Sequence, residues 1–131
     1  MADIPRLNGV IRALESGKPA FTSFCQADPE TAIAMATAKY DGIVYEMEHN
    51  PWDIRALRDS LQYMLNRGQI AKSGSVAPTV TPMVRIPPNG AEKAQFQAKQ
   101  AFDLASTASS GRTFRRWTRP TTQSPPAAIR A

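Results

Sequence analysis

Apolar residues recur along the first 104 residues with two alternating spacings, one typical of helices and one typical of strands. Near the start they fall at i, i+3, i+4 and i+7, at Leu7, Val10, Ile11 and Leu14. This spacing places them on one face of a helix. Gly17 follows, and a glycine directly after such a pattern is a common stop signal. We therefore expect a short helix ahead of the first strand.

Three short apolar runs have the length and composition of strands. They span Ala20–Phe24, Gly42–Met47 and Thr79–Ile86, and β-branched and aromatic residues are typical of such runs. Pro82 interrupts the third run. Because proline donates no backbone hydrogen bond, it is confined to edge strands, strand starts and bulges. The third strand is therefore expected to be irregular at this position.

A helical segment follows each strand. The first has Asp28 as an N-cap, Pro29 at the first helical position and Glu30 in the first turn, and it is expected to run to about Ala38. The second has Asp53 as its N-cap and places four apolar residues on one side: Ile54, Leu57, Leu61 and Leu65.

We expect this second helix to end at Gly68 and a glycine- and serine-rich loop to follow it. A last helix is expected from an N-cap at Asn89 through Ala98 to Leu104. The order is thus one helix and then strand–helix three times. Strands separated by helices pair in parallel through right-handed crossovers, which defines an α/β protein.

Doubly wound sheets and (β/α)8 barrels both begin with this order. The residues after the first strand read FCQAD, over positions 24–28, where a dinucleotide fold would carry a glycine-rich phosphate fingerprint. This argues against dinucleotide binding. Three units do not close a barrel, which typically takes about 250 residues.

The charge divides the chain in two. Residues 1–104 hold 11 basic and 11 acidic residues, whereas residues 105–131 hold five arginines and no acid, which accounts for the net charge of +5. The tail also has no Val, Leu or Met. We therefore predict one domain over 1–104 and a basic Ser/Thr/Pro/Arg-rich, disordered tail over 105–131.

Several classes of protein are disfavoured by composition. The single cysteine, Cys25, excludes an internal disulfide framework and a cysteine-based zinc site, and it is expected to be a packed small residue. No apolar run approaches the about 20 residues of a membrane span, and no secretory signal precedes the first helix. The expected location is cytoplasmic, with no membrane partner.

Polar residues that could do chemistry lie at the ends of the second and third strands. Glu46, Glu48 and His49 close the second strand, and Arg85 lies near the end of the third. Ligands of α/β proteins bind at the carboxyl ends of strands. A histidine beside carboxylates suits a general base, and an arginine suits a carboxylate or enolate. The residues alone leave open that His49 is an ordinary loop histidine, that Glu46 and Glu48 are solvated charges, and that Arg85 forms a structural salt bridge.

Two motifs resemble one enzyme family. The run GIVYEMEHNPWD over 42–53, followed by TPMVRIP over 81–87, is similar to the HpcH/HpaI family of metal-dependent pyruvate aldolases. That family includes 4-hydroxy-2-oxoheptanedioate aldolase and has a (β/α)8 fold. The resemblance covers about residues 5–104. It implies that the chain is an N-terminal fragment, of about three β/α units, of a TIM barrel.

The resemblance implies a role for each residue of the two motifs. His49 matches the catalytic base, and Arg85 matches the arginine that holds the pyruvate carbonyl and stabilises the enolate. Glu46 stands where the family has an aspartate that orients the base, and Glu48 matches a supporting glutamate. The implied reaction is reversible retro-aldol cleavage of 4-hydroxy-2-oxoacids, an aldehyde-lyase activity.

The resemblance also implies a cofactor and partners. The cofactor is a divalent metal, Mg²⁺ or Mn²⁺, and the family holds it through a Glu and an Asp of later strands. Those strands would lie beyond Leu104, so no metal ligand is expected in this chain, which is then expected to be inactive. The partners are a 2-oxoacid substrate and, in the intact family, further copies in a homo-oligomer.

A shifted reading frame would explain the tail. The family continues after this helix with a fourth strand of the form DLGxYGIVxPxI. If one base were lost in the codon after Leu104, Ser106, Ser109 and Ser110 read as TCN would come from codons of Phe, Leu, Ile or Val. The recovered segment can then read VYGIVWPHI, a strand of that form. We therefore predict that residues 105–131 are out of frame.

Two other functions remain as alternatives. A small, complete α/β interaction domain without catalysis would need a three-stranded sheet with both faces covered. A nucleic-acid binder would use Arg115, Arg116 and Trp117 of the tail to contact phosphates and stack on bases. Because the frame argument already accounts for these arginines, no specific nucleic-acid partner is expected.

Overall fold

The computed structural model describes residues 6–88, 93 and 95–108. Asn89 and residues 109–131 therefore lie outside the described residues. The elements, in chain order, are α1 (Gly9–Glu15), β1 (Thr22–Cys25), α2 (Pro29–Ala36), β2 (Gly42–Glu46), α3 (Ile54–Tyr63), α4 (Arg67–Ser73), β3 (Thr81–Arg85) and α5 (Gln95–Ala108). The predicted order of one helix followed by three strand–helix units is confirmed, except that two helices, α3 and α4, follow β2.

The three strands form one parallel sheet in the order β1-β2-β3. Pro82 lies in β3, at the edge of this sheet. Thr81 donates its N–H to Asp41 O (3.1 Å) and Arg85 accepts from Met47 N–H (2.9 Å). The backbone groups of successive strand residues point alternately to the two sides of a strand. The backbone nitrogen of Pro82 therefore points away from β2, to the unpaired side of β3. The missing N–H therefore costs no hydrogen bond, and β3 continues through the proline.

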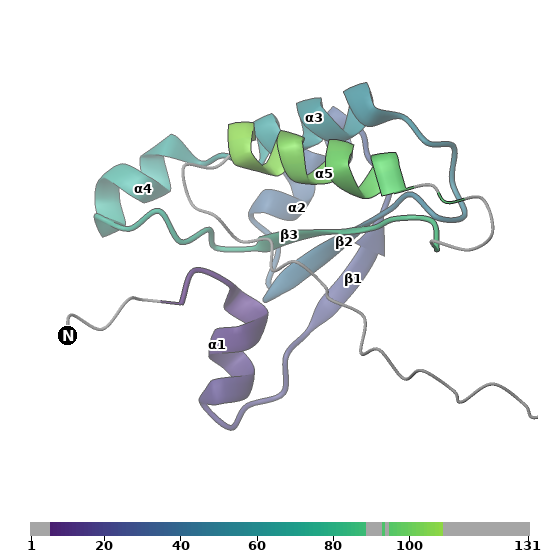
Figure 1. Cartoon of the computed structure of the whole chain (residues 1–131). Helices are drawn as coiled ribbons and strands as arrows, with labels where there is room; N and C mark the ends of the chain where they lie inside the picture. Colours follow the sequence, from purple (N-terminus) through teal and green to yellow (C-terminus); the bar gives the residue numbers. More distant parts are fainter. Residues whose placement is uncertain (1–5, 89–92, 94, 109–131) are drawn as a thin grey trace, which may run out of the picture.

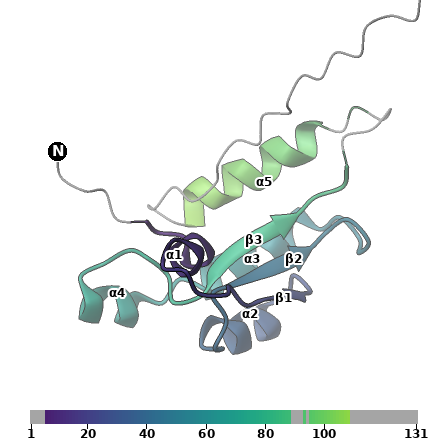
Figure 2. The same ribbon diagram turned by 90° about the horizontal axis from the view of Figure 1, so that it is seen from below.

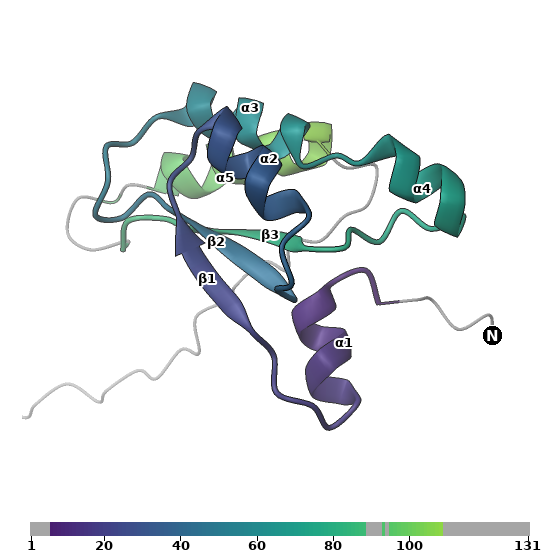
Figure 3. The ribbon, with the colours of Figure 1, turned by 180° about the vertical axis from the view of Figure 1, so that it is seen from behind.

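One face of the sheet is covered by α2, α3 and α5 (Figures 1 and 3). Alternate strand residues point toward these helices and form the core: Cys25 on β1, and Ile43 and Tyr45 on β2. Leu57 and Leu61 of α3 meet them, and both are buried. This face holds the larger part of the buried apolar surface and so most of the stabilisation.

The opposite face, which we call the open face, carries no such helices among the described residues (Figure 2). Its side chains follow from the strand register, which aligns Phe24, Val44 and Met83 across the sheet. Phe24 is 59% exposed, although its neighbour Cys25 is 9% exposed. The larger residue of this pair thus points away from the core.

Helix α1 lies at the amino-terminal ends of the strands (Figure 1). The Gly9 N–H donates to Thr81 Oγ1 (2.7 Å), and a Cβ at Gly9 would lie 2.6 Å from Asp41 O. A Cβ at Gly42 would lie 2.9 Å from Val10 Cγ2. The two glycines therefore allow α1 to contact the sheet backbone closely, at the end opposite to the carboxyl ends of the strands.

The caps predicted for two helices are confirmed. Asp28 Oδ1 accepts from Thr31 N–H (2.8 Å), and Asp53 Oδ1 accepts from Ala56 N–H (3.0 Å). In α1, Asn8 Oδ1 accepts from Ile11 N–H (3.2 Å). These side chains satisfy amide groups that the first helical turn leaves unpaired.

The predicted helix from Asp53 to Gly68 is correct as far as Tyr63 and wrong after it. Helix α3 ends at Tyr63, and a separate helix, α4, begins at Arg67. The cause is Asn66, whose Oδ1 accepts from Gln69 N–H (2.9 Å) and so caps a new helix. Helix α4 replaces the start of the predicted loop and ends at Gly74, which has a left-handed φ of 64°.

Helix α5 begins at Gln95 and reaches Ala108, four residues beyond the predicted end at Leu104. Its Ala101 is buried against the core. At 14 residues it is the longest helix of the described part. None of the helices described has both the length and the apolar character that crossing a bilayer requires.

Candidate functional site

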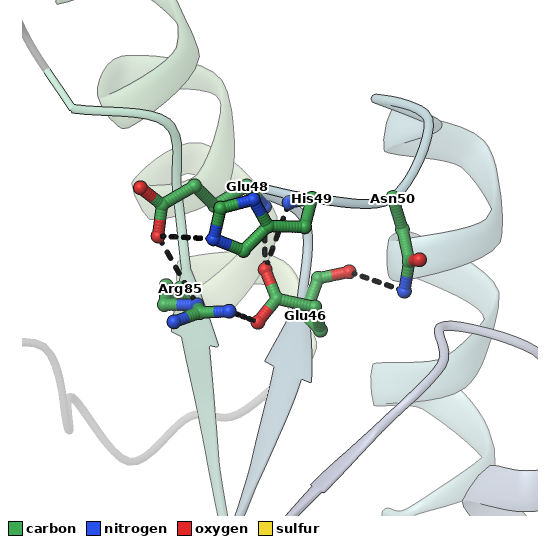
Figure 4. Close-up of polar contacts among 5 residues, drawn as sticks. All are labelled: Glu46, Glu48, His49, Asn50 and Arg85. Atoms are coloured by element: carbon green, nitrogen blue, oxygen red, sulfur yellow. Dashed lines mark hydrogen bonds and ion pairs between the residues drawn. The ribbon is translucent and has the colours of Figure 1, made fainter.

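Glu46 and Arg85 meet at the carboxyl ends of neighbouring strands. They are Cα partners in the parallel register of β2 and β3. The register also places both on the open face, because they follow Val44 and Met83 by two residues. The loop after β2 adds Glu48, His49 and Asn50 to the same cluster (Figure 4). The sequence order of two strands thus brings four predicted site residues together.

An ion pair joins the two strand ends. Arg85 Nη2 contacts Glu46 Oε2, and the Glu46 side chain is only 12% exposed. The hydrogen bond from Arg85, with further ones from backbone N–H groups, lowers the pKa of Glu46 from 4.5 to about 2. The same pairing raises the pKa of Arg85. Both groups are therefore fully charged at neutral pH.

The second oxygen of Glu46 shapes the loop that follows. Glu46 Oε1 accepts from Glu48 N–H (2.8 Å) and from His49 N–H (3.1 Å). Asn50 Nδ2 donates to the Glu46 carbonyl (3.2 Å), which closes the same turn (Figure 4). Glu46 therefore fixes the backbone on which His49 is carried, while its other oxygen holds Arg85.

Glu48 lies between the Arg85 guanidinium and the His49 imidazole. Its Oε2 is 3.2 Å from Arg85 Nε and 3.7 Å from His49 Nε2. The imidazole itself is 70% exposed. The Glu48 carboxylate thus lies where it can orient the imidazole ring, an arrangement that suits a general base.

The roles suggested for the two glutamates can be compared with their contacts. Glu46 was expected to orient the base, and it contacts the His49 backbone N–H (3.1 Å). Glu48, expected to give support, is the carboxylate beside the imidazole. The structure therefore brings together all four predicted residues, with Glu48 next to the ring and Glu46 under the loop.

Phe24 is a residue of this cluster that the two motifs did not indicate. The Cζ atom of Arg85 lies 4.7 Å from the centroid of the Phe24 ring, a cation–π distance. Phe24 comes from β1, so the three strands each contribute to the cluster. Strand alternation in the sequence separates Phe24 from its neighbour Cys25, but only the register of the sheet places Phe24 on the same face as Arg85.

Cys25, the other residue considered for chemistry, points into the core. It is buried, and burial followed by the charge of Asp28 raises the pKa of its thiol to about 11. The thiol therefore stays protonated at neutral pH and is a poor nucleophile. The expectation of a packed small residue is confirmed.

The cluster has the groups for proton transfer and for holding an anion. The two ion pairs of Arg85 involve Nη2 and Nε, so Nη1 lies outside both and can donate to an oxyanion. No group of three or more His, Cys, Asp or Glu residues that could hold a metal ion occurs in the described ranges. The oxygens of Glu46 and Glu48 already contact Arg85 or backbone N–H groups. These residues therefore do not fit a metal site by themselves.

Comparison with known proteins adds no relative. No family model, no curated protein and no solved structure matches the chain. The class that the structure itself defines is an α/β protein with a small parallel sheet and a charged cluster at the carboxyl ends of its strands.

Proposed function

We propose that this chain is the first part of a pyruvate aldolase of the HpcH/HpaI type, an aldehyde-lyase that cleaves 4-hydroxy-2-oxoacids to pyruvate and an aldehyde. The observation that carries the proposal is the meeting of Glu46 and Arg85 on the open face, with His49 in the adjoining loop. These are the residues of the two motifs that resemble the family. They lie at the carboxyl ends of the strands, where α/β enzymes bind their ligands.

The sheet supports a barrel over a doubly wound origin. Its strands follow one another in sequence order, and α2, α3 and α5 lie on one face (Figures 1 and 3). A doubly wound sheet reverses its strand order and has helices on both faces. A barrel continues in one direction with every helix outside. In this proposal the open face is part of the barrel interior.

The residues of the cluster divide the chemistry between them. His49 takes the proton of the substrate 4-hydroxyl, because it is exposed and lies beside Glu48. Arg85 donates to the oxygen that becomes negative as the pyruvate enolate leaves. Glu46 keeps both in place, through one oxygen on each side. The metal that the resemblance implies belongs to ligands on later strands.

The proposal also accounts for the basic tail. We take residues 105–131 to be the out-of-frame reading of the fourth strand and the following helix, starting in the last turns of α5. The metal ligands that the resemblance implies belong to later strands. Residues 1–131 by themselves are therefore expected to lack turnover, although the first three units carry the acid–base and anion-binding residues.

The test is pyruvate release from 4-hydroxy-2-oxoacids by the frame-restored protein, with Mg²⁺ or Mn²⁺ and after chelation. We expect metal-dependent release of pyruvate and an aldehyde in equal amounts. The 131-residue chain, assayed in parallel, is the matched control and is expected to show none. A folded, frame-restored protein that releases no pyruvate with either metal would refute the proposed function.

A further inference from the structure

Phe24 has an unusual place for a large apolar residue in a strand. It is 59% exposed, on the open face, while the smaller Cys25 beside it occupies the core. The apolar contribution of Phe24 to folding is correspondingly small, since stabilisation follows the area removed from water. Packing in the helix-covered core therefore does not explain this aromatic ring.

The contact that Phe24 does make is with Arg85. The ring centroid is 4.7 Å from the Arg85 Cζ atom. The two residues lie on strands that are not neighbours, because β2 separates β1 from β3. The Arg85 side chain therefore reaches across the open face to lie over the ring, and the negative face of the ring attracts the guanidinium charge.

The Arg85 guanidinium thus has partners both at its edge and against its plane. Glu46 contacts Nη2 and Glu48 lies 3.2 Å from Nε, so the carboxylates lie along one edge of the group. Phe24 lies under Cζ and adds a contact that the carboxylates do not supply. The arginine side chain has several rotatable bonds, so without these contacts it would sample many orientations. Together the three contacts leave the Nη1 end in one position.

We infer that Phe24 is a positioning residue, which holds the plane of the Arg85 guanidinium so that its free end faces a bound anion. This inference extends the proposed function, on which it rests for the identity of the anion. It adds β1 to a site that the motifs assign to β2 and β3 alone. The specific requirement is an aromatic ring, because an aliphatic side chain of similar size has no negative face.

The contact is tested in the full 131-residue chain by NMR of the arginine Nε–H groups. The Arg85 signal is identified by its loss in Arg85→Lys. The aromatic ring is expected to shift this signal upfield of the other arginines. In Phe24→Leu the shift is expected to vanish, and the exchange of the Arg85 Nε–H with water is expected to become about 2- to 5-fold faster, the range that an exposed cation–π contact supports.

Two further variants separate positioning from packing. Phe24→Tyr keeps the ring, so it is expected to preserve both the shift and the slow exchange. Phe21→Leu removes an aromatic residue that is 61% exposed and three residues earlier in the chain, and it is expected to change neither. Far-ultraviolet circular dichroism verifies that each variant keeps its helices and strands.

The inference is overturned if Arg85 in the parent chain coincides with the other arginines. It is also overturned if Phe24→Leu behaves as the parent, or if Phe24→Tyr loses the signal as Phe24→Leu does. Because this measurement needs no turnover, it is independent of the aldolase assay. A frame-restored protein without activity would refute the proposed function and leave the positioning of Arg85 as measured.

Discussion

The two faces of the sheet are built from alternate residues of the same three strands, yet they differ in every property that matters for function. On the face covered by helices, Ile43 and Tyr45 are fully buried. On the open face, Val44 lies between Met83 and Phe24, of which Phe24 is exposed. Glu46 and Arg85 follow on this face at the strand ends. The comparison shows that one face stabilises the fold and that the other holds the candidate chemistry.

The two faces also differ in the ionisation of their titratable side chains. The helix-covered face contains Cys25, whose burial raises the pKa of the thiol and keeps it neutral. The open face contains Glu46, whose contact with Arg85 lowers the pKa of the carboxyl and keeps it charged. The charged, accessible groups therefore lie on the open face, so the candidate chemistry and the stability of the fold depend on different residues of the same strands.

The largest expected effect concerns activity and falls on the open face. If the proposed function holds, His49→Ala in the frame-restored protein is expected to lower pyruvate release about 10²- to 10⁴-fold, the usual contribution of a positioned acid–base group. Arg85→Ala is expected to lower it at least as much, because it removes an electrostatic stabiliser of the enolate. Steady-state assays measure both. Near-parental rates in His49→Ala would assign this histidine to an ordinary loop.

The next effect concerns stability and falls on the helix-covered face. Ile43→Ala removes a fully buried side chain and is expected to reduce the free energy of unfolding by about 2–5 kcal/mol. The matched control is Val44→Ala, the next residue of β2 but on the open face, with an expected cost of about 1 kcal/mol. Urea denaturation compares them. Equal costs would show that the open face is packed as tightly as the other.

A smaller effect tests the close contact of α1 with the sheet. In Gly9→Ala the new Cβ would lie 2.6 Å from Asp41 O, so the helix must move, at an expected cost of about 1–3 kcal/mol. In Gly68→Ala the nearest contact is 3.4 Å, to Asn66 Oδ1, and this helical site is expected to gain up to about 1 kcal/mol. Thermal unfolding of the two variants is expected to shift in opposite directions. A gain in Gly9→Ala would contradict the docking of α1.

The smallest effect is the pH dependence of the ion pair. The pKa of Glu46 is lowered from 4.5 to about 2 in the folded chain, so its charge stabilises the fold above pH 4.5. This contribution is lost as the pH falls from about 4.5 toward 2. The parent chain is therefore expected to lose more stability over that range than Glu46→Gln, as followed by urea denaturation at each pH. Parallel losses would show that Glu46 is not paired with Arg85.

The sequence was sufficient for the parts of the fold that depend on local signals. Asp28 and Asp53 were identified as caps because side-chain oxygens next to a helical pattern have one common use. The meeting of Glu46 with Arg85 could also be expected, since the carboxyl ends of parallel strands share one edge. Both predictions depend on spacing alone, which a sequence displays directly.

Other features depend on side-chain directions, which spacing does not define. Asn66 divides a predicted helix in two because its Oδ1 accepts from Gln69 N–H and so caps a new helix. The sequence pattern does not show that an asparagine within it has this role. Phe24 was interpreted as part of an apolar strand, and only the register shows that it faces Arg85 rather than the core. The two oxygens of Glu46 serve different partners, which follows from one rotamer and from no motif.

The most direct test of the central claim, that these three units begin an aldolase barrel, is the nucleotide sequence from codon 104 onward. We predict that inserting one base after the Leu104 codon opens a frame that reads a fourth strand of the form VYGIVWPHI. This frame should continue to about 250 residues in total, the usual length of the barrel, with a Glu and an Asp at later strand ends. A sequence in which no shifted frame continues beyond the tail, or continues without strand–helix repeats, would contradict the claim.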